Sequence, residues 1–319
     1  MNILLTGAGG FVASHCIDEF VSCGHTLWAT SRRPFADPRL ETGEALVADL
    51  TDADEVRAVV STAKPEIIVH LAAQSNPAHS WAIPEATFQT NVFSTAHLTR
   101  AAGELLDSPL LIFASSSDVY GRPEPNELPL TERSPIRPHT PYAASKVAAE
   151  HMAKVVGKRF GCRVVIVRPF SHTGPGQTEK FVVPAFARQI AMVEAGFQKR
   201  LGHGNISSHR DFTDARDVAR AYRLIAEANL SAGTFNICSG KSYSIEEILD
   251  LMLTLTVSPV ESVLDPDRYR DEKASELSGD ASLVREVVGW EPRISLKQTL
   301  FDVLAEQRAQ VGLLAERTP

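Results

Sequence analysis

The feature that most constrains this chain is a short apolar run that leads directly into a glycine-rich loop. Residues 3–5 (Ile-Leu-Leu) predict a buried strand, and residues 6–10 (Thr-Gly-Ala-Gly-Gly) open a helix. Glycines here permit a tight turn and let backbone N–H groups approach a pyrophosphate, while the small Ala13 lets helix and strand pack closely. The spacing GxxGxxA between a strand and a helix therefore predicts a dinucleotide site. Its predicted cofactor-binding residues are Gly7, Gly9, Gly10, Phe11 and Val12.

The hydrophobic pattern predicts the fold class. Apolar, β-rich runs alternate with amphipathic stretches, and their continuous hydrophobicity indicates burial on both faces of a parallel sheet. The predicted strands are residues 3–5, 26–29, 45–48, 67–70, 110–114 and 163–167, and the predicted helices are residues 52–63, 84–105 and 142–160. We therefore expect an α/β, Rossmann-type doubly wound parallel sheet.

The pattern changes after residue 168, where longer loops separate predicted helices at residues 182–195, 215–228, 245–255 and 296–309. We interpret residues 1–168 as a cofactor-binding domain and residues 169–319 mainly as a smaller α/β substrate-binding lobe. Several pieces of this lobe are too short to bury a core alone. We do not expect it to fold independently.

Charge and residue spacing exclude several function classes. The net charge of −7 argues against a nucleic-acid partner, which needs a basic field. No run approaches the length of a membrane span, and Met1 leads almost directly into the first strand. The histidines and the four scattered cysteines lack metal-site spacing, so no metal is expected. These features predict a cytoplasmic protein with a small-molecule ligand and no membrane contact.

The end of the second predicted strand bears on the choice of cofactor. An acidic residue there would hold the ribose 2′-OH of NAD(H), but no carboxylate appears before Asp37. Arg32 and Arg33 stand instead where a 2′-phosphate would lie. NADP(H) is therefore favoured; if the two arginines only solvate a loop, NAD(H) remains an alternative.

Two further segments are predicted to contact the cofactor from their positions after strands. Asp49 and Leu50 follow the third predicted strand and are placed near the adenine. Leu71, Ala72 and Ala73 follow the fourth and are placed on the pyrophosphate side.

A tyrosine and a lysine four residues apart carry the predicted chemistry. Tyr142 and Lys146 lie one helical turn apart, so both project from one face. A nearby ammonium favours phenolate over phenol, which predicts a lowered tyrosine pKa and a role in proton transfer. Residues 115–118 (Ser-Ser-Ser-Asp) follow the fifth strand, where open α/β sheets place their ligands. A hydroxyl there would bond the substrate oxygen.

With these motifs in order, the chain resembles the extended short-chain dehydrogenases/reductases, the NAD-dependent epimerase/dehydratase family that acts on nucleotide sugars. The matching segments are TGAGGFVASH at 6–15, HLAAQS at 70–75, SSSDVYG at 115–121 and PYAASK at 141–146. The resemblance implies that Ser116, Tyr142 and Lys146 are catalytic, with Tyr142 and Lys146 also at the cofactor. Asn91 corresponds to an asparagine that recurs in the family, in either a structural or a functional role.

A narrower resemblance comes from the second lobe. RPFSHTGPGQ at 168–177, FVVP at 181–184 and RDFTD at 210–214 resemble the GDP-4-keto-6-deoxy-D-mannose reductases. Ser171 replaces the usual asparagine of that group, and Arg210 matches an arginine directed at the nucleotide diphosphate. The predicted substrate-binding residues are Ser117, Asp118, Ser171, His172, Arg210 and Arg270.

The resemblance predicts NADPH-dependent reduction of the C4 keto group of a nucleotide 4-keto-6-deoxy sugar, with a GDP-sugar favoured. GDP-mannose 4,6-dehydratase and nucleotide-sugar 4-epimerase remain alternatives because they share the fold and the triad. In the dehydratases a glutamate stands at the position of Asp118, which is one methylene shorter. A non-catalytic nucleotide sensor is a remote alternative. The resemblance also implies a homodimer.

Overall fold

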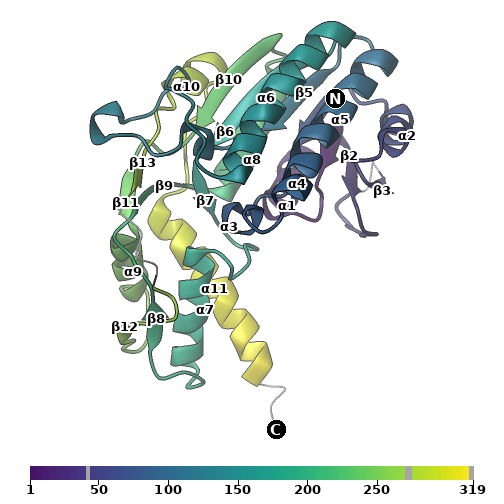
Figure 1. Cartoon of the computed structure of the whole chain (residues 1–319). Coiled ribbons are helices and arrows are strands. Elements are labelled where there is room, and N and C mark those ends of the chain that lie inside the picture. Colours follow the sequence, from purple (N-terminus) through teal and green to yellow (C-terminus); the bar gives the residue numbers. More distant parts are fainter. Residues whose placement is uncertain (41–43, 270–274, 316–319) are drawn as a thin grey trace.

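The structure is a computed structural model that describes residues 1–40, 44–269 and 275–315. Within these residues, seven parallel strands form one sheet in the larger lobe, in the order β10-β6-β5-β4-β1-β2-β3 (Figure 1). The strands are Asn2–Thr6 (β1), Thr26–Ser31 (β2), Ala45–Val47 (β3), Ile67–His70 (β4), Leu110–Ala114 (β5), Arg163–Pro169 (β6) and Ala232–Ile237 (β10). The predicted Rossmann-type doubly wound fold is confirmed.

Helices cover both faces of this sheet. On one face α1 (Phe11–Ser22) packs against α8 (Ala215–Glu227); on the other, α5 (Ser94–Leu105) packs against both α2 (Ala53–Ala63) and α6 (Pro141–Phe160). Shorter helices are α3 (Pro77–Ser80), α4 (Pro84–Phe88) and α10 (Ser282–Val288). Successive side chains of a strand point to opposite faces of the sheet, and helices cover both faces. Every position in the strand is therefore buried, which explains the continuous hydrophobicity of the strands.

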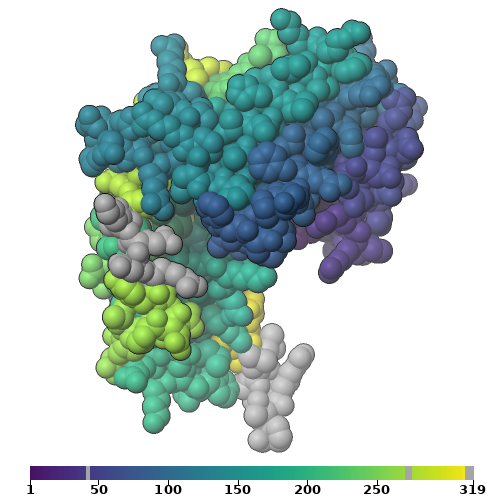
Figure 2. Space-filling model, in the orientation of Figure 1, coloured from purple at the N-terminus to yellow at the C-terminus, as the bar shows by residue number. Residues whose placement is uncertain are grey.

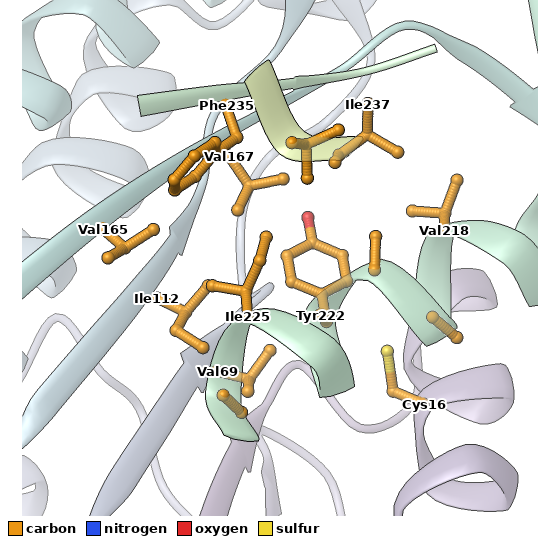
Figure 3. Close-up of a cluster of buried hydrophobic side chains, with 14 of the residues drawn as sticks. Cys16, Val69, Ile112, Val165, Val167, Val218, Tyr222, Ile225, Phe235 and Ile237 are labelled. Atoms are coloured by element: carbon orange, nitrogen blue, oxygen red, sulfur yellow. The ribbon is translucent and has the colours of Figure 1, made fainter. Parts of the chain in front are cut away.

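Side chains of β1 show this division. Ile3 and Leu5 are buried in the core beneath α1 and α8, whereas Leu4 is buried in the core on the other face. Figure 3 shows the first of these cores around Tyr222 of α8, which lies against Val167 of β6 and Ile237 of β10.

Local sequence sets the bounds of α6. The Thr140 side chain accepts a hydrogen bond from the N–H of Ala143, and Pro141 occupies the first helical position. Gly161 ends the helix in the left-handed conformation, at φ 84°. These features hold the first turn of α6, with Tyr142, at the end of the sheet.

Two details differ from the sequence prediction. The apolar runs predict six strands, whereas the described sheet has a seventh, β10, which pairs with β6. Residues on both sides of the boundary predicted at 168 therefore build the large sheet. The single helix predicted over residues 84–105 is interrupted by a π-helical segment, Gln89–Phe93. Side chains in this segment are held by loop contacts from outside the helix, described below, which periodicity does not reveal.

The smaller lobe has its own core and three main helices. These are α7 (Val182–Glu194), α9 (Ile245–Leu253) and α11 (Leu296–Ala315). Its strands are Ser171–Thr173 (β7), Leu201–His203 (β8), His209–Asp214 (β9), Ser242–Ser244 (β11), Ser262–Leu264 (β12) and Glu276–Leu277 (β13). In Figure 2 the two lobes appear as an upper and a lower mass that meet at a narrower waist.

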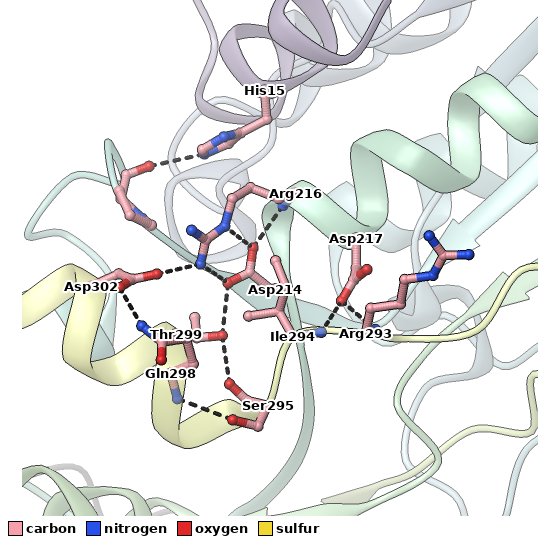
Figure 4. A network of polar contacts seen from close by, with 11 residues as sticks. His15, Asp214, Arg216, Asp217, Arg293, Ile294, Ser295, Gln298, Thr299 and Asp302 are labelled. Carbon is pink, nitrogen blue, oxygen red and sulfur yellow. Dashed lines mark hydrogen bonds and ion pairs between the residues drawn. The ribbon is translucent and has the colours of Figure 1, made fainter. Parts of the chain in front are cut away.

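A polar network at this waist joins α8 to α11 (Figure 4). The Asp214 carboxylate caps α8 and lies 2.7 Å from the guanidinium of Arg216, which also lies 2.6 Å from the carboxylate of Asp302. The Thr299 hydroxyl donates to Asp214 at 2.7 Å, and the N–H of Ile294 donates to Asp217 at 2.8 Å. These bonds fix the smaller lobe against the sheet.

No helix in the described ranges is both long enough and apolar enough to cross a membrane.

Two helical glycines give a test of the packing. A Cβ added at Gly157 of α6 would lie 2.6 Å from the carbonyl oxygen of Cys162, whereas one at Gly312 of α11 would meet nothing within 4 Å. Alanine is the better helix former by about 1 kcal/mol. We therefore expect Gly312→Ala to raise the free energy of unfolding by up to about 1 kcal/mol, and Gly157→Ala to lower it by about 1–3 kcal/mol. Urea unfolding measures both; a stabilising Gly157→Ala would contradict the packing of α6 on β6.

Candidate active site

A cavity of about 1060 Å³ lies at the carboxyl ends of the parallel strands. It includes the topological switch point between β1 and β4, where the order of the strands reverses direction. Sheets of this kind usually bind their ligands there. Every predicted site residue that the structure describes lines this cavity. They are Gly7, Gly9, Gly10, Phe11, Val12, Arg32, Arg33, Asp49, Leu50, Leu71, Ala72, Ala73, Ser116, Ser117, Asp118, Tyr142, Lys146, Ser171, His172 and Arg210. Arg270 lies outside the described residues.

The glycine loop forms a cradle at one end of the cavity. Gly7 has φ +76°, and a Cβ there would lie 2.8 Å from the backbone nitrogen of Ala72, so the approach of the loops after β1 and β4 requires glycine. A Cβ at Gly9 would extend into open space. Gly10 begins α1 without a capping side chain. The N-terminal N–H groups of α1 therefore suit a phosphate.

The end of β2 presents two guanidinium groups. Arg32 and Arg33 are exposed, and neither forms a salt bridge within the part of the chain that the structure describes. The next carboxylate along the chain, that of Asp37, forms a salt bridge with Arg39 instead. Hydrogen bonds from Thr51 hold the pKa of Asp49 below its usual range, with a further contribution from Arg32. This end of the cavity suits a dianionic phosphate better than a ribose hydroxyl.

Ser116, Tyr142 and Lys146 converge at the other end. Ser116 follows β5 and caps a 3₁₀ turn, Ser117–Tyr120, by accepting a hydrogen bond from the N–H of Asp118. The Ser116 hydroxyl lies close enough to the Tyr142 phenol to lower its pKa, against the effect of burial. The Lys146 ammonium donates to the carbonyl of Ala114 at 2.8 Å and lies 6.0 Å from the centre of the Tyr142 ring.

The electrostatics here correct one prediction. Lys146 is predicted to lower the pKa of Tyr142, but burial and the nearby Asp118 carboxylate raise it, against the opposing hydrogen bond with Ser116. Burial also lowers the pKa of Lys146 to about 7, with Glu150 opposing. A lysine that loses its charge so readily is a weak stabiliser of a phenolate. Tyr142 is consequently a protonated phenol at neutral pH.

A buried ion pair supports this end of the cavity from behind. Glu150, one turn after Lys146 on α6, lies 2.7 Å from Arg168 of β6, and both side chains are almost fully buried. Glu150 also accepts a 2.5 Å hydrogen bond from Ser115, next to Ser116. Arg168 donates in turn to the Tyr120 hydroxyl at 3.1 Å. The pair thus ties α6, β6 and the serine loop together.

Asn91 has a structural set of contacts. It lies in the π-helical segment, where its carboxamide accepts from the N–H of Gln74 at 2.8 Å and donates to the Gln74 carbonyl at 3.1 Å. It also donates to Ser145 of α6 at 2.8 Å. Its contacts therefore join the loop after β4 to the helix that carries Tyr142.

Strand pairing brings the second-lobe residues to the cavity. β7 pairs with β9, so Ser171 and His172 lie beside the strand that carries Arg210. The Arg210 guanidinium donates to the carbonyl of Ser275 at 2.8 Å. Burial raises the pKa of Asp118, and the nearby His139 and Arg210 oppose that shift. Asp118 and Arg210 thus face each other across the two lobes.

His172 is partly buried and stacks on Phe11, with the ring centres 6.2 Å apart. Burial lowers the pKa of His172, with a bond to the Phe170 carbonyl opposing. A neutral imidazole that packs on the cofactor loop helps to shape the cavity. Within the described residues, no cluster of histidine, cysteine and acidic side chains could hold a metal ion.

The cavity also includes residues that the sequence did not predict as site residues. Phe170 and Phe212 line it near the smaller lobe, and Val218 and Tyr222 line it from α8. Tyr222 sits on the apolar face of an amphipathic helix, where a tyrosine usually serves the core. Only the packing of α8 beneath β6 places it at the cavity.

With this geometry established, comparison with known proteins identifies the family. The family model described as GDP-mannose 4,6 dehydratase matches residues 4–303. The chain belongs to this family.

Relatives of this family member carry the names of different activities. A GDP-6-deoxy-D-mannose reductase of Pseudomonas aeruginosa is 33% identical, over 97% of this chain and 98% of that protein. A UDP-glucose 4-epimerase of Mycolicibacterium smegmatis is 29% identical, over 93% of this chain and 96% of the relative. The solved structure of RMD from Pseudomonas aeruginosa complexed with NADPH matches with a TM-score of 0.85 at 31% identity, covering 97% of this chain and all of the other.

The buried Lys146 of this family member gives a pH test. Its pKa is about 7 in the fold, whereas an unfolded lysine titrates near 10.4. Between these values the unfolded chain binds the proton that the folded chain has released, so this residue makes stability rise with pH. We expect Lys146→Met to remove that rise, by up to about 1.4 kcal/mol per pH unit between pH 7 and 10.

Urea unfolding at several pH values measures the effect. Lys154→Met, at an exposed lysine of the same helix, is the matched control and should follow the wild-type profile. Parallel profiles for wild type and Lys146→Met would show that Lys146 keeps an ordinary pKa.

Proposed function

We propose that this protein is an NADPH-dependent reductase of the C4 keto group of a nucleotide 4-keto-6-deoxy sugar, with GDP-4-keto-6-deoxy-D-mannose as the substrate and GDP-6-deoxy-D-mannose as the product. The observation that carries the proposal is the Tyr142 phenol, which burial keeps protonated and which lines the cavity close to the Ser116 hydroxyl. Reduction of a ketone needs a proton donor at the carbonyl oxygen, and a phenol of raised pKa meets that need.

We assign the steps at the sugar to residues of this chain. Bound NADPH supplies the hydride that reduces C4. Tyr142 donates its proton to the C4 oxygen, and the Ser116 hydroxyl stabilises the charge that develops there. Lys146, held by the Ala114 carbonyl, orients the cofactor beside Tyr142. Removing water from this buried end strengthens each of these interactions.

The cofactor residues are assigned from the other end of the cavity. The glycine loop and the start of α1 would hold the pyrophosphate, with Leu71, Ala72 and Ala73 opposite. Arg32 and Arg33 would bind the 2′-phosphate of NADPH, and Asp49 and Leu50 would contact the adenine. The related structure named above binds NADPH. NAD(H) lacks the 2′-phosphate and would bind more weakly.

The smaller lobe would hold the nucleotide diphosphate. Arg210 is near enough to Asp118 to oppose the rise of its pKa, and the pairing of β7 with β9 places Ser171 and His172 beside the strand of Arg210. With Ser117, these residues form the proposed substrate side. The GDP-sugar assignment is supported by the 33% identical GDP-6-deoxy-D-mannose reductase. The resemblance described above also implies that Asp118 stands where the dehydratases carry a glutamate. Dehydratase and epimerase activities are the alternatives that the experiments below exclude or reveal.

We further propose a cytoplasmic homodimer. All four cysteines are free thiols, as expected in a reducing compartment. Large apolar side chains are exposed on adjoining elements, at Phe88 of α4, Phe93 of the π-helical segment and Val155 of α6. An apolar surface over α4 and α6 suits burial against the same surface of a second copy.

The arginine pair predicts a cofactor preference. Replacing Arg32 and Arg33 together with alanine should raise the Michaelis constant for NADPH about ten- to hundredfold, because only the 2′-phosphate loses its partners. The constant for NADH should change less than about threefold. Arg57→Ala, at an exposed arginine paired with Glu104, is the control. Equal effects on the two cofactors would remove the reason for choosing NADPH.

The reaction itself is tested with purified protein and two sugar nucleotides. GDP-4-keto-6-deoxy-D-mannose should consume one NADPH per molecule reduced, and GDP-mannose should be inert. Asp118→Asn should keep turnover within about tenfold, since the reduction needs no base there. Tyr142→Phe should lose about 10²- to 10⁴-fold while still binding NADPH. Consumption of GDP-mannose without added reductant, lost in Asp118→Asn, would establish the dehydratase instead.

A further inference from the structure

Tyr222 is a buried phenol that none of the assigned steps uses. It lies on α8, its side chain is 1% exposed, and it lines the main cavity together with Val218 of the same helix. In Figure 3 its oxygen points away from α8, toward Val167 of β6 and Ile237 of β10. β6 ends at Pro169, which lines the cavity, so the hydroxyl points toward the sheet close to its carboxyl edge.

No hydrogen bond joins the Tyr222 hydroxyl to another described residue, and its oxygen is not among the fully enclosed polar atoms without a partner, so it opens onto the cavity that Tyr222 lines. Its labelled neighbours in Figure 3 are apolar, apart from the thiol of Cys16. Burying a hydroxyl without a partner costs free energy, so such groups in native proteins usually meet a protein group, water or a ligand. Burial also raises the pKa of Tyr222 far above its usual range, so the group is a hydrogen-bond donor at any working pH. Its partner must therefore offer an acceptor from the cavity.

The position along the cavity narrows the choice of acceptor. Tyr142 is near enough to influence Tyr222 electrostatically, whereas Arg32 and Arg33 line the cavity at the end of β2. A dinucleotide with its pyrophosphate at the glycine loop and its adenosine at the arginines has its nicotinamide beside Tyr142. Val12, Val218 and Phe170 give that region apolar walls that suit a flat ring. The polar substituent of the ring is its carboxamide.

We propose that the Tyr222 hydroxyl donates a hydrogen bond to the carboxamide oxygen of the nicotinamide ring. This inference rests on the proposed function, because it takes NADPH as the ligand. It makes Tyr222 a cofactor-binding residue that fixes the rotation of the ring about its glycosidic bond. That rotation decides which face of the ring is turned toward Tyr142 and the sugar.

Calorimetric titration of the full chain tests the contact. Tyr222→Phe should weaken NADPH binding about three- to tenfold, the effect of one neutral hydrogen bond. Binding of adenosine 2′,5′-bisphosphate, which carries the same phosphates near the arginines but no nicotinamide, should stay within twofold. The loss should persist with the reduced 3-acetylpyridine analogue of NADPH, which keeps the carbonyl and lacks the amide nitrogen. Tyr243→Phe, at a tyrosine outside the cavity lining, is the matched control and should bind both ligands as wild type does.

Each outcome decides the proposal. Unchanged NADPH affinity in Tyr222→Phe overturns it, and so does an equal loss for adenosine 2′,5′-bisphosphate, which would indicate a general defect. A loss that disappears with the acetylpyridine analogue overturns donation to the carbonyl. Because the hydroxyl has no protein partner, Tyr222→Phe should not lower the unfolding temperature; a clear decrease would mean that the hydroxyl has a structural partner. Failure of the wild-type protein to bind either ligand would overturn the proposed function instead.

Discussion

The site is built around a buried hydrogen bond that joins the last residues of β1 and β4. The Thr6 hydroxyl and Nδ1 of His70 lie 2.7 Å apart, and Nε2 of the same ring lies 3.1 Å from the Thr95 hydroxyl of α5. Burial and the nearby Lys146 lower the pKa of His70 to about 3, so the ring stays neutral and bridges two hydroxyls. The loops that follow β1 and β4 leave the sheet side by side at this point, and both line the cavity.

Burial then determines the chemistry of the groups placed at that point. Tyr142 and Lys146 are enclosed by α6 and the sheet, and burial shifts the pKa of each toward its uncharged form. The buried pair of Glu150 and Arg168 keeps its charges because each has the other. The site thus combines a neutral phenol at the reacting end with a fixed ion pair behind it. Such an arrangement suits proton donation to a carbonyl, with little rearrangement of charge.

The sequence predicted what depends on short-range pattern. The glycine loop, most strand and helix bounds and the cavity-lining motifs follow from residues close together in the chain, and the structure places them as expected. The place of Tyr222 at the cavity and the pairing of β10 with β6 were not predicted, because both depend on contacts between segments far apart in the sequence. The pKa of Tyr142 was predicted with the wrong sign because spacing shows that Lys146 is near but not how deeply both are buried. The π-helical segment at Asn91 likewise depends on a loop 17 residues away.

The pairing of β10 with β6 has a consequence for how the chain is made. Residues 164–169 and 232–237 lie side by side in the sheet. In the sequence they are separated by the segment that contains β7, α7, β8, β9 and α8. During synthesis the β6 edge therefore stays open until residue 237 has left the ribosome. An unpaired parallel edge of that kind is a surface to which other chains can attach. Over this stretch of synthesis, well after the glycine loop has been translated, the edge of β6 is the part of the sheet that is open to pairing with another chain.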